Sequence, residues 1–144
     1  MTGAILRSGA AILLALFPLA SQAATPVEPP LSSAQNKVVS KSIAKLKRPE
    51  ERKLAAGWSN AKKVAEVICR PAALPVLKKE VSGADRVFLG TDDPATLTLV
   101  SDKTLIGSGQ VRSGADWTEF SFTCQLDPKT GKASAFKVSM KPAG

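Results

Sequence analysis

The sequence contains no histidine and no tyrosine among its 144 residues. Without histidine, the chain lacks the usual general base near neutral pH, the usual zinc ligand and a Ser-His-Asp triad. No serine stands in a Gly-x-Ser-x-Gly context, and no glycine-rich phosphate-binding loop is present. These absences argue against the common hydrolase and nucleotide-binding classes and leave carboxylates as the remaining acid–base groups.

The carboxylates do not form a recognisable catalytic or metal-binding pattern. The pair Asp92-Asp93 precedes Pro94 in a segment typical of a turn. With Asp102 added, the spacing still lacks the alternation of a calcium-binding loop. The sequence therefore predicts no catalytic residue, no metal site and no cofactor.

A long hydrophobic run is also missing, so no permanent membrane anchor is expected. The short apolar stretch over residues 10–17 follows Arg7 and precedes the small-x-small segment at residues 21–23. This pattern predicts a secretory signal peptide over residues 1–23, cleaved after Ala23, and a mature chain in the periplasm or outside the cell. Residues 24–34 are rich in proline and are expected to form an extended tether.

Cysteine is scarce, because Cys69 and Cys124 are the only two. An even count without a Cys-x-x-Cys motif in an exported chain indicates a structural disulfide rather than reactive thiols. Such a bridge closes a loop of about 55 residues and stabilises the fold by roughly 4 kcal/mol on the chain-entropy model.

Basic residues outnumber acidic ones and give the chain a net charge of +8, but they are unevenly distributed. Residues 24–79 carry twelve lysines and arginines against four acidic residues, and residues 80–144 carry seven against eight. The asymmetry favours an anionic envelope polymer, lipid headgroups or an acidic protein as partner. The alternative is that the lysines only keep a small protein soluble. Export and the lack of interleaved aromatics argue against nucleic acid.

Residues 35–48 predict a basic amphipathic helix. Three apolar residues share one side: Val39, Ile43 and Leu46. Four basic residues lie nearly opposite: Lys37, Lys41, Lys45 and Arg48. The helix either lies on an anionic surface through its lysines or docks its apolar stripe on the domain and leaves them solvated. The absence of Trp or Phe anchors favours docking.

The remaining segments predict helices followed by strands. Helices are expected over residues 49–56, 60–69 and 72–80, with a break at Arg70-Pro71 because proline cannot continue the helical hydrogen bonding. After residue 83 the apolar period changes to two, which predicts five strands: residues 86–89, 95–100, 104–112, 117–126 and 133–140. Gly107 and Gly109 indicate a bulge or a close backbone approach in the third strand.

These elements indicate an α+β fold over residues 49–144, with the helices packed on a small antiparallel meander sheet. The fourth strand is the expected centre of the core, since its apolar residues alternate onto one face: Phe120, Phe122, Cys124 and Leu126. Cys69 falls on the inward face of a predicted helix. The disulfide is therefore expected to join helix to sheet.

Arg112 and Trp117 flank one predicted hairpin turn and are expected to meet across the two strands. An arginine stacked on an indole can hold a carboxylate or a sugar. Alternatively, the indole covers the outer sheet face while Arg112 pairs with Glu119 or Asp116.

The run Val111-Arg112-Ser113, then Trp117, Phe120-Ser121-Phe122-Thr123-Cys124 and Phe136, with Cys69 upstream, resembles the bacterial family known as domain of unknown function 930. The similarity extends over residues 49–140. The family pattern usually has tyrosine at the position of Thr118 and phenylalanine at that of Val111. The resemblance implies an exported bacterial domain with a cysteine pair and implies no activity.

The sequence thus predicts an exported, non-catalytic binding module for an anionic envelope ligand or a partner protein. Its candidate binding residues are Arg112, Trp117, Lys37, Lys41, Lys45 and Arg48. A carboxylate-dependent hydrolase of envelope polymer is the alternative from another class, and it requires two acidic groups that converge in a concave pocket. A purely structural accessory protein is a third alternative and would expose an apolar patch.

Overall fold

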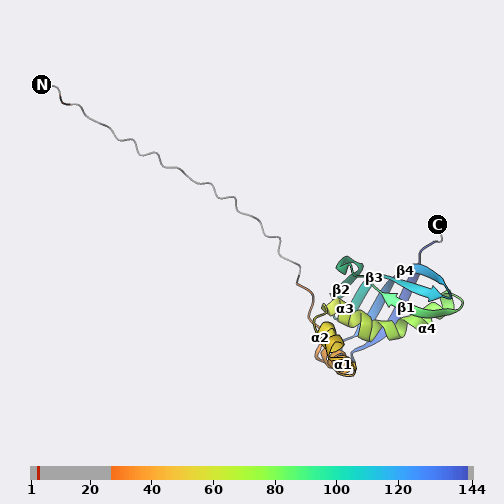
Figure 1. Cartoon of the computed structure of the whole chain (residues 1–144), viewed down its shortest axis with the longest axis horizontal. Helices are drawn as coiled ribbons and strands as arrows, with labels where there is room; N and C mark the ends of the chain where they lie inside the picture. Colours follow the sequence, from red (N-terminus) through yellow and green to blue (C-terminus); the bar gives the residue numbers. More distant parts are fainter. Residues whose placement is uncertain (1–2, 4–26, 143–144) are drawn as a thin grey trace.

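The computed structural model describes residue 3 and residues 27–142. The predicted signal peptide and its cleavage site after Ala23 lie outside the described residues, apart from Gly3. Figure 1 shows the helices gathered over one face of a twisted sheet, with α1 and α2 at one end of the molecule. No helix of the described part is both long and apolar enough to cross a bilayer.

Helix α1 (Ser33–Ala44) begins with a capping box, in which Ser32 and Gln35 each accept a hydrogen bond from the other's backbone N–H. The helix docks on the domain through its buried side, on which Val39 is 4% exposed. The predicted docking is therefore confirmed. The helix ends four residues earlier than expected, so Leu46 and Arg48 lie beyond it.

The segment before α1 belongs to the domain instead of leading loosely into it. Leu31 is buried in the core. The Glu28 carboxylate accepts hydrogen bonds from the backbone N–H groups of Asn60 (2.8 Å) and Ala61 (3.0 Å), at the start of a later helix. The prediction of an extended tether is therefore wrong for residues 28–31, because the Glu28 carboxylate and Leu31 hold this stretch against the helical layer.

Gln35 joins α1 to the sheet and is fully buried. Its Nε2 donates to the backbone carbonyl oxygen of Asp102 (2.6 Å), and its Oε1 accepts from the backbone N–H of Ser32 (2.9 Å). A buried amide is tolerated here because both of its ends are hydrogen-bonded.

Helix α2 (Pro49–Ala56) has the predicted bounds. The predicted break at Arg70-Pro71 is wrong, because α3 (Asn60–Lys63), the π-helical turn η1 (Val64–Cys69) and α4 (Arg70–Glu80) follow one another directly. The backbone N–H of Arg70 donates to the carbonyl oxygen of Ala65, five residues earlier. The wider π-turn accommodates the proline ring that would clash in a regular α-helix.

The sheet contains five antiparallel strands, which confirms the α+β fold: β1 (Ala84–Leu89), β2 (Leu97–Ser101), β3 (Thr104–Ser113), β4 (Asp116–Asp127) and β5 (Lys132–Met140). Strands β2 to β5 form the expected meander. Strand β1 also pairs with β3, beside β2 on the same edge. Residues 90–96, with the 3₁₀ turn η2 (Pro94–Thr96), separate β1 from β2.

The inner face of the sheet carries the core, as the alternation in β4 predicts. The apolar side chains of this strand are all buried: Phe120, Phe122, Cys124 and Leu126. The predicted disulfide is confirmed, since Cys69 in η1 is bonded to Cys124 in β4, with 6.1 Å between their Cα atoms. One covalent bond thus joins the helical layer to the middle of the sheet.

The predicted close backbone approach at the glycines of β3 is also confirmed. A Cβ atom on Gly109 would lie 2.5 Å from the carbonyl oxygen of Phe88 and 2.7 Å from Cζ of Phe120. The ring of Phe120 therefore occupies the space that a side chain on β3 would need.

Candidate functional site

The lysines of α1 point away from the domain. Because Gln35 and Val39 face the core, the opposite side of the helix exposes Lys37, Lys41 and Lys45. No salt bridge within residues 27–142 involves any of the three. Their charges are free to act on an external partner.

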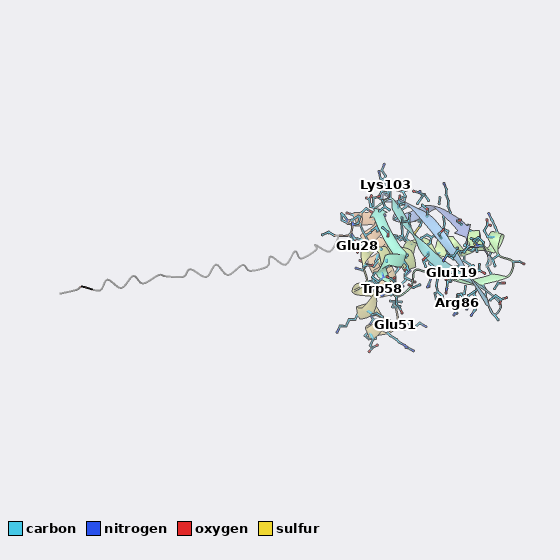
Figure 2. The ribbon with its side chains drawn as sticks, turned by 90° about the horizontal axis from the view of Figure 1, so that it is seen from above. Glu28, Glu51, Trp58, Arg86, Lys103 and Glu119 are labelled. Carbon is cyan, nitrogen blue, oxygen red and sulfur yellow. A yellow bond between two sulfur atoms is a disulfide. The ribbon has the colours of Figure 1, made fainter. Side chains whose placement is uncertain are left out.

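Two hairpin turns bring further lysines to the same end of the fold. The hydroxyl of Ser32 donates to the carbonyl oxygen of Pro128 (2.7 Å) in the β4–β5 turn. The β2–β3 turn is joined to α1 by the hydrogen bond from Gln35 to Asp102. We call the resulting set of exposed lysines the lysine end: Lys37, Lys41, Lys45, Lys103, Lys129 and Lys132. Figure 2 shows Lys103 on the side of the molecule away from Arg86 and Glu119.

Arg48 does not lie in line with Lys37, Lys41 and Lys45, although the helical wheel predicts that it does. It follows the end of α1 and is the residue before Pro49 at the start of α2. Its Nε lies 3.9 Å from a carboxylate oxygen of Glu51, and both side chains are largely exposed. The physical reason is the early end of α1, after which the chain leaves the helical path.

Arg112 and Trp117 meet across β3 and β4, as predicted. They are opposite one another in the register, and the guanidinium carbon lies 5.8 Å from the centroid of the indole. The prediction that Arg112 pairs with Glu119 or Asp116 is wrong. Arg112 instead makes two hydrogen bonds to the carboxylate of Asp85, from Nε (3.0 Å) and Nη2 (3.1 Å).

The pairing of β1 with β3 explains this partner, because it places Asp85 next to Arg112. The hydrogen bond from Arg112 holds the pKa of Asp85 below its usual value. Glu119 is bound by Lys141 (2.6 Å), which in the same way lowers the pKa of Glu119. An anion that binds Arg112 must therefore compete with Asp85.

Phe88 belongs to this cluster and was not identified from the sequence. Its ring stacks on Trp117 with 5.4 Å between centroids and 15° between planes, and each of the two residues is 43% exposed. The alternation of β1 places Phe88 on the outer face, but only the pairing of β1 with β3 brings it near Trp117. The indole thus covers the outer sheet face, and its role in ligand binding stays a prediction.

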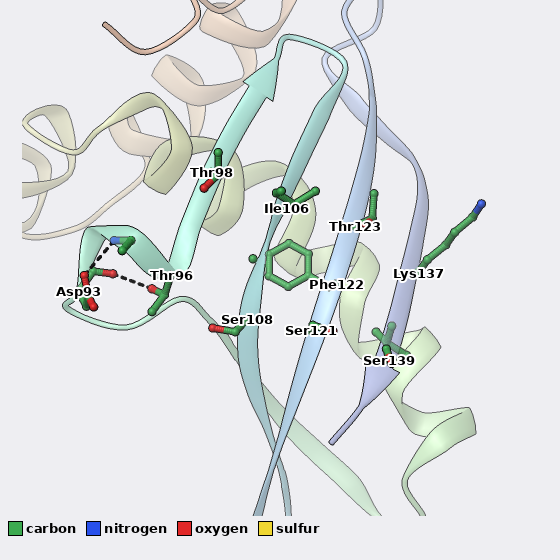
Figure 3. A pocket seen from close by; sticks show the side chains of 13 residues that line it. Asp93, Thr96, Thr98, Ile106, Ser108, Ser121, Phe122, Thr123, Lys137 and Ser139 are labelled. Carbon is green, nitrogen blue, oxygen red and sulfur yellow. Dashed lines mark hydrogen bonds between the residues drawn. The ribbon is translucent and has the colours of Figure 1, made fainter. Parts of the chain in front are cut away.

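A groove of about 690 Å³ crosses the outer face of the sheet (Figure 3). Its floor includes Ser108, Ser121 and Ser139, which are neighbours in the register of β3, β4 and β5. In Figure 3, Asp93 lies at one side of the groove and Lys137 at the other. Asp93 is the one carboxylate among the described residues that line it, and its Oδ1 accepts from the backbone N–H of Ala95 (2.9 Å). This carboxylate therefore caps η2.

Neither a metal centre nor a family is assigned by the remaining observations. Within the described residues, no three His, Cys, Asp or Glu side chains are grouped so that they could hold a metal ion. No protein-family model matches the chain, and neither a curated protein nor a solved structure matches it. The resemblance to domain of unknown function 930 stays a prediction.

Proposed function

We propose that this protein is an exported, non-catalytic binding module that holds an anionic polymer of the cell envelope through its lysine end. The observation that carries the proposal is the gathering of six exposed lysines from α1 and two hairpin turns. Two carboxylates stand at the same turns, Asp102 and Asp127. The surplus of positive charge attracts polyanions and raises their rate of association.

Export is supported by the buried disulfide, because disulfides persist in oxidising compartments outside the cytosol. The predicted signal peptide over residues 1–23 points the same way. The periplasm or the cell exterior is the proposed location, and both contain anionic polymers.

A polymer suits the lysine end better than a bilayer does. Lys37, Lys41 and Lys45 are four residues apart, so successive lysines rise about 6 Å along the helix. The other exposed residues of α1 are serine, asparagine and alanine. A helix that lies in a membrane surface inserts large apolar or aromatic side chains, which this face lacks. A row of charges without such anchors fits repeated phosphates or carboxylates.

The test is a binding measurement with soluble polyphosphate as the probe, at low and at physiological salt. A lysine near an anionic surface contributes about 1 kcal/mol to binding, which salt reduces. The triple variant with Lys37→Gln, Lys41→Gln and Lys45→Gln is therefore expected to bind at least tenfold more weakly.

The matched control removes three exposed lysines elsewhere: Lys53→Gln, Lys78→Gln and Lys79→Gln. It has the same net charge, and it should bind polyphosphate nearly as well as the unchanged protein. Equal loss in both triple variants would contradict the proposal, because net charge alone would then explain binding. Tighter binding to phosphatidylglycerol vesicles than to polyphosphate would assign the surface to lipid headgroups instead.

A further inference from the structure

The helices cover one face of the sheet (Figure 1), and the opposite, outer face carries two exposed aromatic residues. Phe88 of β1 and Trp117 of β4 stack on one another across β3, and each residue is 43% exposed. Single apolar residues on a protein surface are ordinary, but two large rings in contact form a patch. Such a patch on an uncovered sheet face indicates an interaction site.

The register of the strands places this aromatic pair next to the groove that crosses the outer face. Phe88 is opposite Gln110, which is itself opposite Glu119. Two residues further along β3 and β4 are Ser108 and Ser121, which line the groove. Two residues along a strand correspond to about 7 Å. The aromatic pair and the groove are therefore continuous.

We call this surface the outer track: Phe88, Trp117, Ile106, Ser108, Ser121 and Ser139. The three serines form a row across β3, β4 and β5. Their hydroxyl groups take part in no hydrogen bond within residues 27–142. Ile106 lies in the next row of the groove and is 40% exposed. The track thus offers hydroxyl groups that can donate and accept, together with exposed apolar surface.

The charges beside the aromatic pair are already neutralised. Arg112 is bound to Asp85 (3.0 Å), and Glu119 is bound to Lys141 (2.6 Å). A carboxylate ligand would have to displace Asp85 from Arg112, so the sugar is the better of the two ligands predicted for Arg112 and Trp117.

The unpaired charges of the outer face stand at the borders of the track. Arg86 belongs to the outermost strand β1, and Figure 3 shows Asp93 and Lys137 on opposite sides of the groove. None of the three forms a salt bridge within residues 27–142. The floor between them complements an uncharged ligand.

We propose that the outer track binds an extended chain of uncharged sugars. A sugar ring has an apolar C–H face and a rim of hydroxyl groups. The C–H face packs on the exposed parts of Phe88 and Trp117, and the hydroxyl groups bond to the serine row. Trp117 and Thr123 are six residues apart on β4, so the track extends over about 20 Å, enough for a tetrasaccharide. A bilayer is a poorer occupant, because it would leave the serine hydroxyls without partners.

The carboxylates beside the aromatic pair favour binding of the sugar chain and not its cleavage. The hydrogen bond from Arg112 lowers the pKa of Asp85, and that from Lys141 lowers the pKa of Glu119. A glycoside hydrolase needs a carboxylic acid of raised pKa to protonate the leaving oxygen. Both carboxylates instead stay ionised at neutral pH.

The test is a calorimetric titration with two uncharged, extended probes, cellotetraose and tetra-N-acetylchitotetraose. At least one should bind with a millimolar or lower Kd, and physiological salt should leave its affinity unchanged because no charge is involved. Trp117→Ala and Phe88→Ala should each weaken that binding at least tenfold by removing the apolar contact. Ser121→Arg, which fills the groove from an exposed position, should do the same.

The matched control is Leu54→Ala, which removes an exposed apolar side chain from α2. It should leave the affinity within about threefold of the unchanged protein. The proposal would be overturned if neither tetrasaccharide binds at millimolar concentration, or if the Trp117→Ala and Ser121→Arg variants bind as well as the unchanged protein. Recovery of shortened sugars after incubation would show cleavage and would equally refute a binding role.

The inference does not rest on the lysine end, and the two sites can be tested separately. The triple glutamine variant of α1 should keep its affinity for the tetrasaccharide, while Trp117→Ala should keep its affinity for polyphosphate. Absence of polyphosphate binding with intact sugar binding would refute the proposed function alone. The converse result would refute the outer track alone.

Discussion

Loss of the Cys69–Cys124 disulfide is expected to lower the melting temperature by about 15 °C. The bridge closes a loop with a sequence separation of 55 residues. On the chain-entropy model such a loop contributes roughly 4 kcal/mol, which is a large part of the about 5 to 15 kcal/mol that stabilises a small domain. For a domain of about 115 residues, 1 kcal/mol corresponds to about 4 °C.

The structure adds a reason for the bond to matter at this position. Both cysteines are fully buried, and they join η1 to the central strand β4. Without the bond, the helical layer is held to the sheet by packing and by side-chain hydrogen bonds such as those of Gln35 and Glu28. We therefore expect reduction to loosen the contact between the two layers before the sheet itself opens.

The assay compares three forms by calorimetry: the oxidised protein, the protein refolded with its thiols reduced, and the Cys69→Ala, Cys124→Ala double variant. The reduced form keeps the volume of both sulfurs, so its melting temperature isolates the cross-link. The double variant should melt lower still, because it also leaves a cavity. A reduced form that melts within about 3 °C of the oxidised one, with two free thiols measured, would refute the reasoning, since the predicted shift is about 15 °C.

Three further outcomes are expected. Gln35→Ala should destabilise the fold by about 2 kcal/mol in urea titration, because it removes a fully buried side chain and leaves two partly buried backbone groups without partners; a change below 0.5 kcal/mol would contradict that role. Gly109→Ala should cost about 1 to 3 kcal/mol through the clash with β1, whereas Gly57→Ala, which has no contact closer than 3.5 Å, should be neutral or stabilising. The hydrogen bond to Arg112 lowers the folded-state pKa of Asp85, so its stabilising effect is present above the ordinary aspartate pKa and is lost as pH falls through the lower value. Asp85→Asn should therefore flatten the fall in melting temperature below about pH 4, and an unchanged slope would refute the linkage.

Local signals predicted most of the individual elements. The proline at position 49 and the glycine at position 57 set the bounds of α2, because proline fits a first helical position and glycine follows a helix end. Strict alternation in β4 placed Phe120 and Cys124 on the buried face. The glycines of β3 indicate a close approach of other chain segments. At Gly109 the carbonyl oxygen of Phe88 and the ring of Phe120 occupy the space that a side chain would need. Each of these signals depends on residues within one turn or one strand.

Features that depend on residues far away in the sequence differ from the predictions. A proline after an arginine predicts a helix end, but the π-turn η1 lets the helix continue past Pro71. Proximity in the sequence favours Glu119 or Asp116 as the ion partner of Arg112, whereas the structure pairs Arg112 with Asp85 of β1. The sequence could not show that β1 and β2 share one edge of β3, because both fit an antiparallel pairing and the register is decided by packing.

The α+β class, the helix-to-sheet disulfide and the excess of basic residues before residue 80 can all be predicted without the structure. These follow from periodicity, from the count of cysteines and from composition, which need no neighbours in space. That Lys103, Lys129 and Lys132 join the lysines of α1, and that Asp85 of β1 is the partner of Arg112, follows only from the folded structure. Both arrangements arise from contacts between segments far apart in the chain, and such contacts produce no periodic pattern in the sequence of either segment.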